Sequence, residues 1–244
     1  GAAVTSNTAT SDVADVLDGK VGQYIFISTL SVYAGNATPC KDEDAPRATY
    51  EGEDPMRETR ASLIADMSLY GPLKAEDVRA TFAEQAKALA DGGVDLLLIE
   101  TMFSFEETTA AFEGAKSATD LPIVVSFSYD RGTRSMMGVK PKDVIKRYSE
   151  MGATVIGANC GTTLENMELV VKEYAGTVPN FPLWVKPNAG VPHMDIETEQ
   201  GVYDMGPEDM AAYSKKYVEL GAKIVGGCCG NTPEHVAAIV KAVK

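Results

Sequence analysis

Short apolar runs alternate along this chain with longer segments in which apolar residues recur every three or four positions. Continuous apolar runs are typical of strands buried on both faces, and the three-to-four spacing is typical of amphipathic helices. The expected strands are residues 63–65, 94–99, 123–127, 154–156, 183–185 and 224–225. The expected helices are residues 75–90, 105–116, 141–151, 164–174, 207–220 and 233–243. From about residue 62 onwards, the pattern therefore predicts repeated strand–helix units.

Residue types at the segment ends agree with this division. Pro207 and Pro233 stand where the first turn of a helix accepts proline, and Thr232 is placed to cap the last helix. Gly152 and Gly221 follow helical segments, at the position where a left-handed residue often ends a helix.

The first 61 residues add roughly two further units: an apolar run at 3–6, a helix at 11–17 and a strand at 23–28. A polar segment, residues 38–58, reads as a loop. Six strand–helix units from about residue 62 onwards and roughly two before it make eight, the number of units in a (βα)₈ barrel. The predicted fold class is therefore α/β, a TIM-type barrel with an atypical or incomplete N-terminal part.

Composition narrows the function. A net charge of −13 argues against nucleic acid and anionic membrane surfaces as partners. No apolar run approaches the roughly 18 residues of a membrane span, and residues 1–5 do not resemble a secretory leader. Four cysteines in 244 residues are too few for a disulfide framework, so we expect reduced thiols or metal ligands in a cytoplasmic protein.

Three of the four cysteines follow predicted strands. Cys160 ends the segment 153–161, and Cys228 and Cys229 follow the run 223–225 between glycines. Three thiolates at two strand ends are what a catalytic zinc needs, with a fourth position left for a substrate. Zinc would hold a substrate thiol as the thiolate, which points to chemistry on sulfur.

The alternative is that these are ordinary buried cysteines. Adjacent side chains on a regular strand point to opposite faces, so Cys228 and Cys229 can share a metal only if the strand breaks before them. The flanking glycines permit that break. Cys40 lies in the polar loop and is expected to be a spare thiol.

Several motifs from about residue 62 to the C-terminus resemble the zinc-dependent homocysteine S-methyltransferase family. They are residues 71–78 (GPLKAEDV), 90–102 (ADGGVDLLLIETM), 157–161 (GANCG), 186–192 (KPNAGVP) and 226–230 (GGCCG). The resemblance implies a barrel with Zn²⁺ on Cys160, Cys228 and Cys229, and Glu100 on the ammonium group of homocysteine.

Each further candidate has a plainer alternative. Glu100 could bond a neighbouring loop, and Asn188 could form the turn in which it stands rather than contact substrate near the metal. Asn159 could orient the adjacent Cys160 or bond a loop. We expect His235 to cap a helix or lie at the surface rather than bind metal. His193 lies in a loop with no indicated role.

The N-terminal part is different. Residues 21–34 resemble the fourth strand of extended short-chain dehydrogenases and nucleotide-sugar epimerases, as does the segment 42–46. Tyr70 and Lys74 match their Tyr-x-x-x-Lys pair, with Thr29 as the catalytic hydroxyl, but no Gly-rich phosphate loop precedes them. We interpret residues 1–61 as a Rossmann-like βαβ segment integrated in the barrel and 62–244 as methyltransferase-like barrel units, hence a chimera. The family's N-terminal Asp-Gly motif, which helps to hold the substrate amino group, is missing.

The function implied by the resemblance is methyl transfer to the thiolate of homocysteine, forming methionine. The donor would be a methylcorrinoid protein or a sulfonium or quaternary ammonium compound. The segment 134–139 (RSMMGV) looks most like family members associated with corrinoid proteins. Met136 and Met137 could line the approach of such a partner or fill gaps in the core. The alternatives are a chimeric or engineered barrel scaffold without activity, and a nucleotide-sugar epimerase or reductase remnant.

Overall fold

Strands and helices alternate throughout the part of the chain that the computed structural model describes, residues 75–194 and 201–244. The helices are α3 (Ala75–Asp91), α4 (Phe105–Ala118), α5 (Pro141–Met151), α6 (Leu164–Thr177), α7 (Pro207–Glu219) and α8 (Pro233–Val243). The main strands are β1 (Leu97–Met102), β2 (Ile123–Ser128), β3 (Val155–Cys160), β4 (Leu183–Pro187) and β7 (Ala222–Val225). Two short strands, β5 (His193–Met194) and β6 (Gly201–Val202), pair with each other in an antiparallel ribbon.

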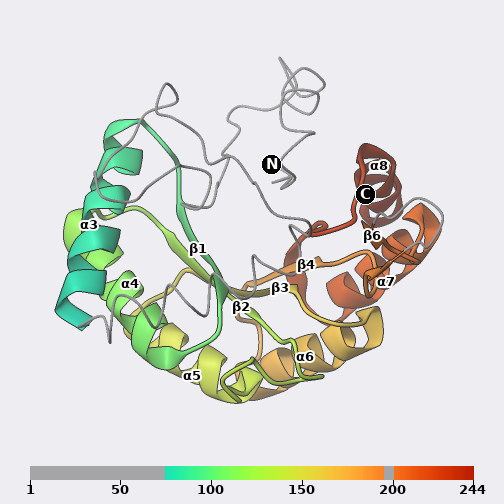
Figure 1. Cartoon of the computed structure of the whole chain (residues 1–244), viewed down its shortest axis with the longest axis horizontal. Coiled ribbons are helices and arrows are strands. Elements are labelled where there is room, and N and C mark those ends of the chain that lie inside the picture. The colour runs from blue at the N-terminus through green and yellow to red at the C-terminus, as the bar shows by residue number, and fades with distance from the viewer. Residues whose placement is uncertain (1–74, 195–200) are drawn as a thin grey trace. The chain divides into compact units, whose positions relative to one another are not determined.

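The five main strands form one parallel sheet in the order β1-β2-β3-β4-β7, which is also their order along the chain. The helices between them lie along one face of this sheet (Figure 1). Repeated strand–helix units with parallel neighbours are the arrangement of a TIM-type barrel, in which all strands end at the same edge. The predicted strand–helix order is confirmed from α3 onwards, and the predictions for residues 1–74 lie outside the described residues.

Side chains alternate between the two faces of the sheet. Ile99, Val125, Ala158 and Val185 belong to the apolar core that packs under the helices. The residues between them point to the opposite, inner face because successive strand residues alternate. Several of these inner residues are buried or nearly buried polar groups: Glu100, Ser126, Ser128, Asn159 and Lys186. The strands are therefore not uniformly apolar, and their polar residues lie on the face away from the helices of the described residues.

Gly157 lets β3 approach β4 closely. A Cβ atom at this position would lie 2.5 Å from the backbone oxygen of Trp184 and 2.8 Å from its Cβ, closer than real Cβ atoms come. The Gly157 carbonyl also accepts a hydrogen bond from the hydroxyl of Tyr174 in α6, at 3.0 Å. The Tyr174 hydroxyl in turn lies 2.6 Å from the hydroxyl of Tyr129, which follows β2. The end of β3, where Cys160 stands, is thus fixed by close backbone packing.

Helix ends follow the expected chemistry. Pro207 and Pro233 occupy first-turn positions, and Gly152 ends α5 in the left-handed conformation with φ of 94°. Thr232 is the N-cap of α8, as predicted. No helix within residues 75–194 and 201–244 is both long and apolar enough to cross a membrane.

Candidate metal centre

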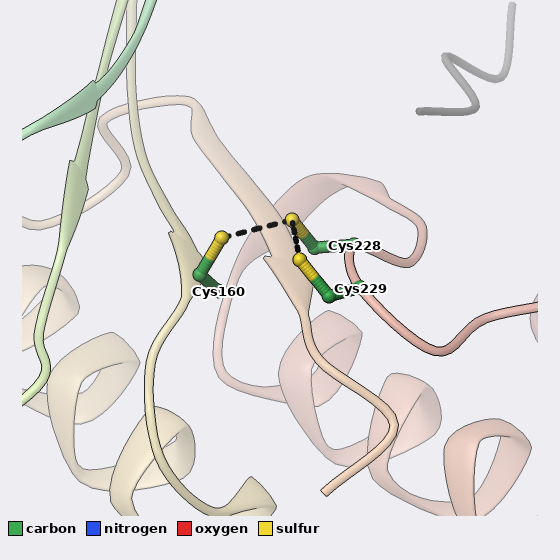
Figure 2. Close-up of side chains that lie close together, drawn as sticks. All are labelled: Cys160, Cys228 and Cys229. Atoms are coloured by element: carbon green, nitrogen blue, oxygen red, sulfur yellow. Dashed lines mark hydrogen bonds between the residues drawn. The ribbon is translucent and has the colours of Figure 1, made fainter. Parts of the chain in front are cut away.

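The thiols of Cys160, Cys228 and Cys229 converge at one point. Cys160 is the last residue of β3, and the other two lie in the loop between β7 and α8. The Cys160 and Cys228 Sγ atoms are 3.0 Å apart, and those of Cys228 and Cys229 are 3.9 Å apart. All three sulfurs lie within 4.8 Å of one another, as Figure 2 shows. The fold therefore brings together residues from two separate strand ends.

Local backbone geometry aims these side chains. β7 ends at Val225, so Gly226 and Gly227 take the chain out of the strand before the two cysteines. Adjacent side chains can then turn to the same point, which a regular strand forbids. A Cβ atom on Gly227 would collide with the Asn231 side chain, so this tight path requires glycine. Cys160 has φ of 53°, a left-handed conformation that is uncommon for a residue with a side chain.

The donor set fits zinc. Zinc binds cysteine sulfur at about 2.3 Å, so sulfurs arranged tetrahedrally around it lie about 3.8 Å apart. The sulfur separations here are on that scale. Cys229 is exposed while Cys228 is buried, so the cluster is open on one side. Such an open position is what distinguishes a catalytic zinc site from a closed structural one.

The three thiols also shift one another's pKa values. Hydrogen bonding with Cys228 raises the pKa of Cys160, whereas hydrogen bonds from Cys160 and Cys228 lower the pKa of Cys229 to about 3. One sulfur of the cluster is therefore favoured as a thiolate. Burial and the charge on Cys229 together raise the pKa of the nearby Tyr203 to about 12. The ring of Tyr203 packs against Gly230, just after the cysteine pair.

Asn159 is buried and fully engaged. Its Oδ1 accepts hydrogen bonds from the Ser126 hydroxyl at 2.6 Å and from the Thr101 N–H at 3.2 Å. Its Nδ2 donates to Thr101 Oγ1 at 2.8 Å and to the Cys160 sulfur at 3.3 Å. Of the two roles considered from sequence, these contacts favour orientation of Cys160, because no part of the amide faces an open site.

Asn188 connects the two cysteine-bearing loops. Its Oδ1 accepts a hydrogen bond from the Cys229 N–H at 3.1 Å, and its Nδ2 donates to the Gly161 carbonyl at 3.2 Å. Its backbone N–H donates to the Cys160 carbonyl at 3.2 Å. Asn188 is thus next to the thiol cluster, where its amide holds the two loops together, and its contact with substrate stays a prediction.

The expected strand 94–99 put Glu100 at the end of the strand, but in the structure Glu100 lies within β1. β1 continues to Met102, with an irregularity in its pairing to β2 between Ile99 and Met102. The Glu100 carboxylate lies 2.7 Å from the Lys186 ammonium, and the two side chains are 10% and 2% exposed. Sequence reasoning missed Lys186, although a lysine directly after Leu183-Trp184-Val185 was a signal.

The predictions for His235, Met136 and Met137 agree with the structure to different extents. His235 caps α8, as expected, since its Nδ1 accepts the Thr232 N–H at 3.1 Å, but it is buried rather than on the surface. Its Nε2 lies 3.0 Å from the Met205 carbonyl. Met136 and Met137 are 53% and 69% exposed, so they do not fill the core.

Parallel strands in chain order, with helices along one face and a thiol cluster at their carboxyl ends, are the arrangement of a TIM-barrel protein with a candidate metal centre. The family model described as homocysteine S-methyltransferase matches residues 55–243. This chain belongs to the homocysteine S-methyltransferase family.

Individual relatives agree with this assignment. A methionine synthase of Mycobacterium leprae (strain TN) is 28% identical over 172 residues, which are 68% of this chain and 14% of that protein. The metallated form of the homocysteine methyltransferase MmuM from Escherichia coli is 27% identical with a TM-score of 0.58, and the match covers 73% of this chain and 57% of that one. The apo form, 24% identical with a TM-score of 0.58 over 76% and 70% of the two chains, shares the fold. The chain thus spans only a small part of that methionine synthase.

Proposed function

We propose that this chain transfers a methyl group to the thiolate of homocysteine, forming methionine, with Zn²⁺ as its cofactor. The observation that carries the proposal is the convergence of three thiols within 4.8 Å at the carboxyl ends of two strands, in a chain of this family. The relatives support it by name, since they include a methionine synthase and a homocysteine methyltransferase with a metallated form.

The roles that we propose rest on the thiol cluster and on the resemblance to the family. Cys160, Cys228 and Cys229 would hold the ion, which when bound would keep a substrate thiol deprotonated and nucleophilic at neutral pH. Glu100 would accept the ammonium group of homocysteine. The homocysteine sulfur attacks the methyl carbon in line, and the donor leaves with the electrons of the broken bond. The chain's residues contribute mainly by positioning the sulfur for this attack.

The methyl donor that we favour is a methylcorrinoid protein. Met136 and Met137 lie in the loop between β2 and α5, at the carboxyl end of β2 and thus at the same edge of the sheet as the cysteines. Exposed methionines suit an adaptable contact with a hydrophobic partner. A sulfonium or quaternary ammonium compound is the other class of donor that the chemistry admits.

The first test is the zinc content of the reduced, purified protein, measured by elemental mass spectrometry against protein concentration. We expect about one zinc per chain, falling steeply in the Cys160→Ser and Cys229→Ser variants and remaining unchanged in the matched control Cys40→Ser. Zinc-loaded protein should then form methionine from homocysteine with methylcobalamin or with a sulfonium or quaternary ammonium donor. A persistent ratio near zero would contradict the metal site. Zinc without methionine formation from any donor would favour an inactive scaffold.

A further inference from the structure

An ion pair joins two strands that are not neighbours. Glu100 lies on β1 and Lys186 on β4, with β2 and β3 between them in the sheet. The two side chains therefore meet over the inner face, where their charged atoms are 2.7 Å apart and almost fully buried. Burying two charges costs free energy that their attraction often fails to recover. A pair in this position is thus a poor device for stability alone and calls for another role.

Both charged groups have bonding capacity to spare. The Lys186 ammonium carries three N–H donors, and among the described residues its one hydrogen bond is to Glu100 Oε1. In the same part of the chain, Glu100 Oε2 accepts no hydrogen bond. Within the described residues, Lys186 thus has donors to spare and Glu100 has an oxygen to spare, and together they are the complement of an α-amino acid, which presents a carboxylate and an ammonium side by side.

The pair lies next to the thiol cluster. Lys186 is paired with Asn159 across β3 and β4, and the next pair along these strands is Cys160 with Pro187. The Pro187 carbonyl accepts a hydrogen bond from the Cys228 N–H at 2.8 Å. One residue along a strand is about 3.3 Å, of the same order as the two methylene groups that separate the sulfur of homocysteine from its α-carbon. The separation suits a ligand that reaches both groups.

We propose that Lys186 binds the α-carboxylate of the substrate and that Lys186 and Glu100 together form a preformed clamp for an α-amino acid zwitterion. The inference rests on the proposed function and deepens it, because it names the residue that recognises the carboxylate. The ion pair stays intact on binding: the substrate carboxylate takes the free N–H donors of Lys186, and its ammonium takes Glu100 Oε2. The four charges then alternate in sign, in surroundings where water screens them little.

Three thiol compounds of equal chain length can be compared to measure what the carboxylate and the ammonium each contribute to binding. Homocysteine carries both charged groups, 3-mercaptopropan-1-amine lacks the carboxylate, and 4-mercaptobutanoate lacks the ammonium. We expect calorimetric titration of zinc-loaded protein to show homocysteine binding about 10- to 100-fold more tightly than either analogue, the range expected for one charge-assisted hydrogen bond. The Lys186→Met variant should lose the preference over the amine, and Lys186→Arg should keep most of it.

Controls separate recognition from folding. Lys186→Met leaves the Glu100 charge buried without its partner, so its unfolding midpoint and zinc content are measured first. The double variant Glu100→Gln with Lys186→Met removes both charges, and it should regain stability while binding all three thiols within about 3-fold of one another. A folded, zinc-loaded Lys186→Met variant that still prefers homocysteine over the amine would overturn the proposal.

The clamp and the proposed function fail in different ways. Wild-type protein that binds the three thiols equally well would overturn the clamp and leave thiol binding in place. Protein that binds methionine in a Lys186-dependent manner but binds none of the thiols would support the clamp and contradict the methyltransferase function. Methionine is the suitable probe for this arm because it has both charged groups and no free thiol.

Discussion

Asn159 holds Thr101 by two hydrogen bonds: its Oδ1 accepts from the Thr101 backbone N–H, and its Nδ2 donates to the Thr101 hydroxyl. Thr101 has φ of 63° and Cys160 has φ of 53°, so the ends of β1 and β3 both adopt a left-handed conformation that costs free energy for these residues. The same amide also donates to the Cys160 sulfur. One buried side chain thus stabilises two unfavourable strand ends at the candidate metal centre.

Replacing Asn159 with alanine should weaken both the fold and the metal site. The Ser126 hydroxyl and the Thr101 N–H would lose their acceptor, which costs about 1–3 kcal/mol of unfolding free energy for a buried group. Zinc affinity should fall about 10- to 100-fold, as for other partners of metal ligands. Competition with a chromophoric chelator measures the affinity. The control Ser126→Ala removes one of these bonds and should leave zinc affinity nearly unchanged; equal affinities in all three proteins would refute the assignment.

Asn188→Ala should separate the two cysteine loops. The Asn188 amide accepts a hydrogen bond from the Cys229 N–H and donates one to the Gly161 carbonyl, so it links the two loops. Without these two hydrogen bonds, the thiols should be less well positioned. We expect zinc affinity about 10-fold lower with a smaller effect on the unfolding midpoint. Gln85→Ala is the control, because that amide lies exposed on α3, away from both cysteine loops. A similar loss of zinc in both variants would argue against a specific role for Asn188.

Two glycine-to-alanine substitutions should have opposite effects. Gly157→Ala forces a methyl group into the backbone of β4 at Trp184, and overpacking of this kind costs about 1–3 kcal/mol or more. Gly176→Ala meets no atom within 4 Å and lies in α6, where alanine favours the helix by about 0.5–1 kcal/mol. Urea unfolding of both variants measures the difference. Equal stabilities would show that β3 and β4 can separate at no cost.

Buried tyrosines should make the protein sensitive to alkali. Burial raises the pKa of Tyr129 and of Tyr174 above the usual value near 10. A raised pKa in the folded state means that the folded protein holds its phenol protons more tightly than the unfolded chain. Their contribution to stability is therefore complete below about pH 10 and is lost as the pH rises towards the folded-state pKa, by up to about 1.4 kcal/mol per pH unit for each tyrosine.

The Tyr174→Phe variant tests this expectation. It should be less stable at neutral pH, because the Gly157 carbonyl and the Tyr129 hydroxyl lose a partner. Its unfolding free energy should then decline less steeply than that of the wild type between pH 10 and pH 11. Parallel slopes for the two proteins in urea titrations would contradict the role of this pair.

The sequence was sufficient for features that depend on local order or on a general property of parallel sheets. Cys160 and the Cys228–Cys229 pair could be predicted to meet because parallel strands end at one edge, and the flanking glycines signalled the necessary break. Lys186 could not be paired with Glu100 in this way, since their strands are not adjacent and the contact depends on the curvature of the sheet. His235 was expected to cap a helix, but its contact with Met205, a residue 30 positions earlier, could not be predicted from the local pattern.

The spacing of the cysteines has a consequence for folding as well as for catalysis. Cys160 and Cys228 are 68 positions apart in the chain, and the segment between them carries α6, β4, β5, β6, α7 and β7. An ion bound to all three sulfurs would act as a reversible cross-link across this loop. Closing a loop of this length with a disulfide stabilises a protein by roughly 4 kcal/mol through the entropy of the unfolded chain. A chelator would then lower the melting temperature, so that loss of the metal and exposure of this region to proteases would go together.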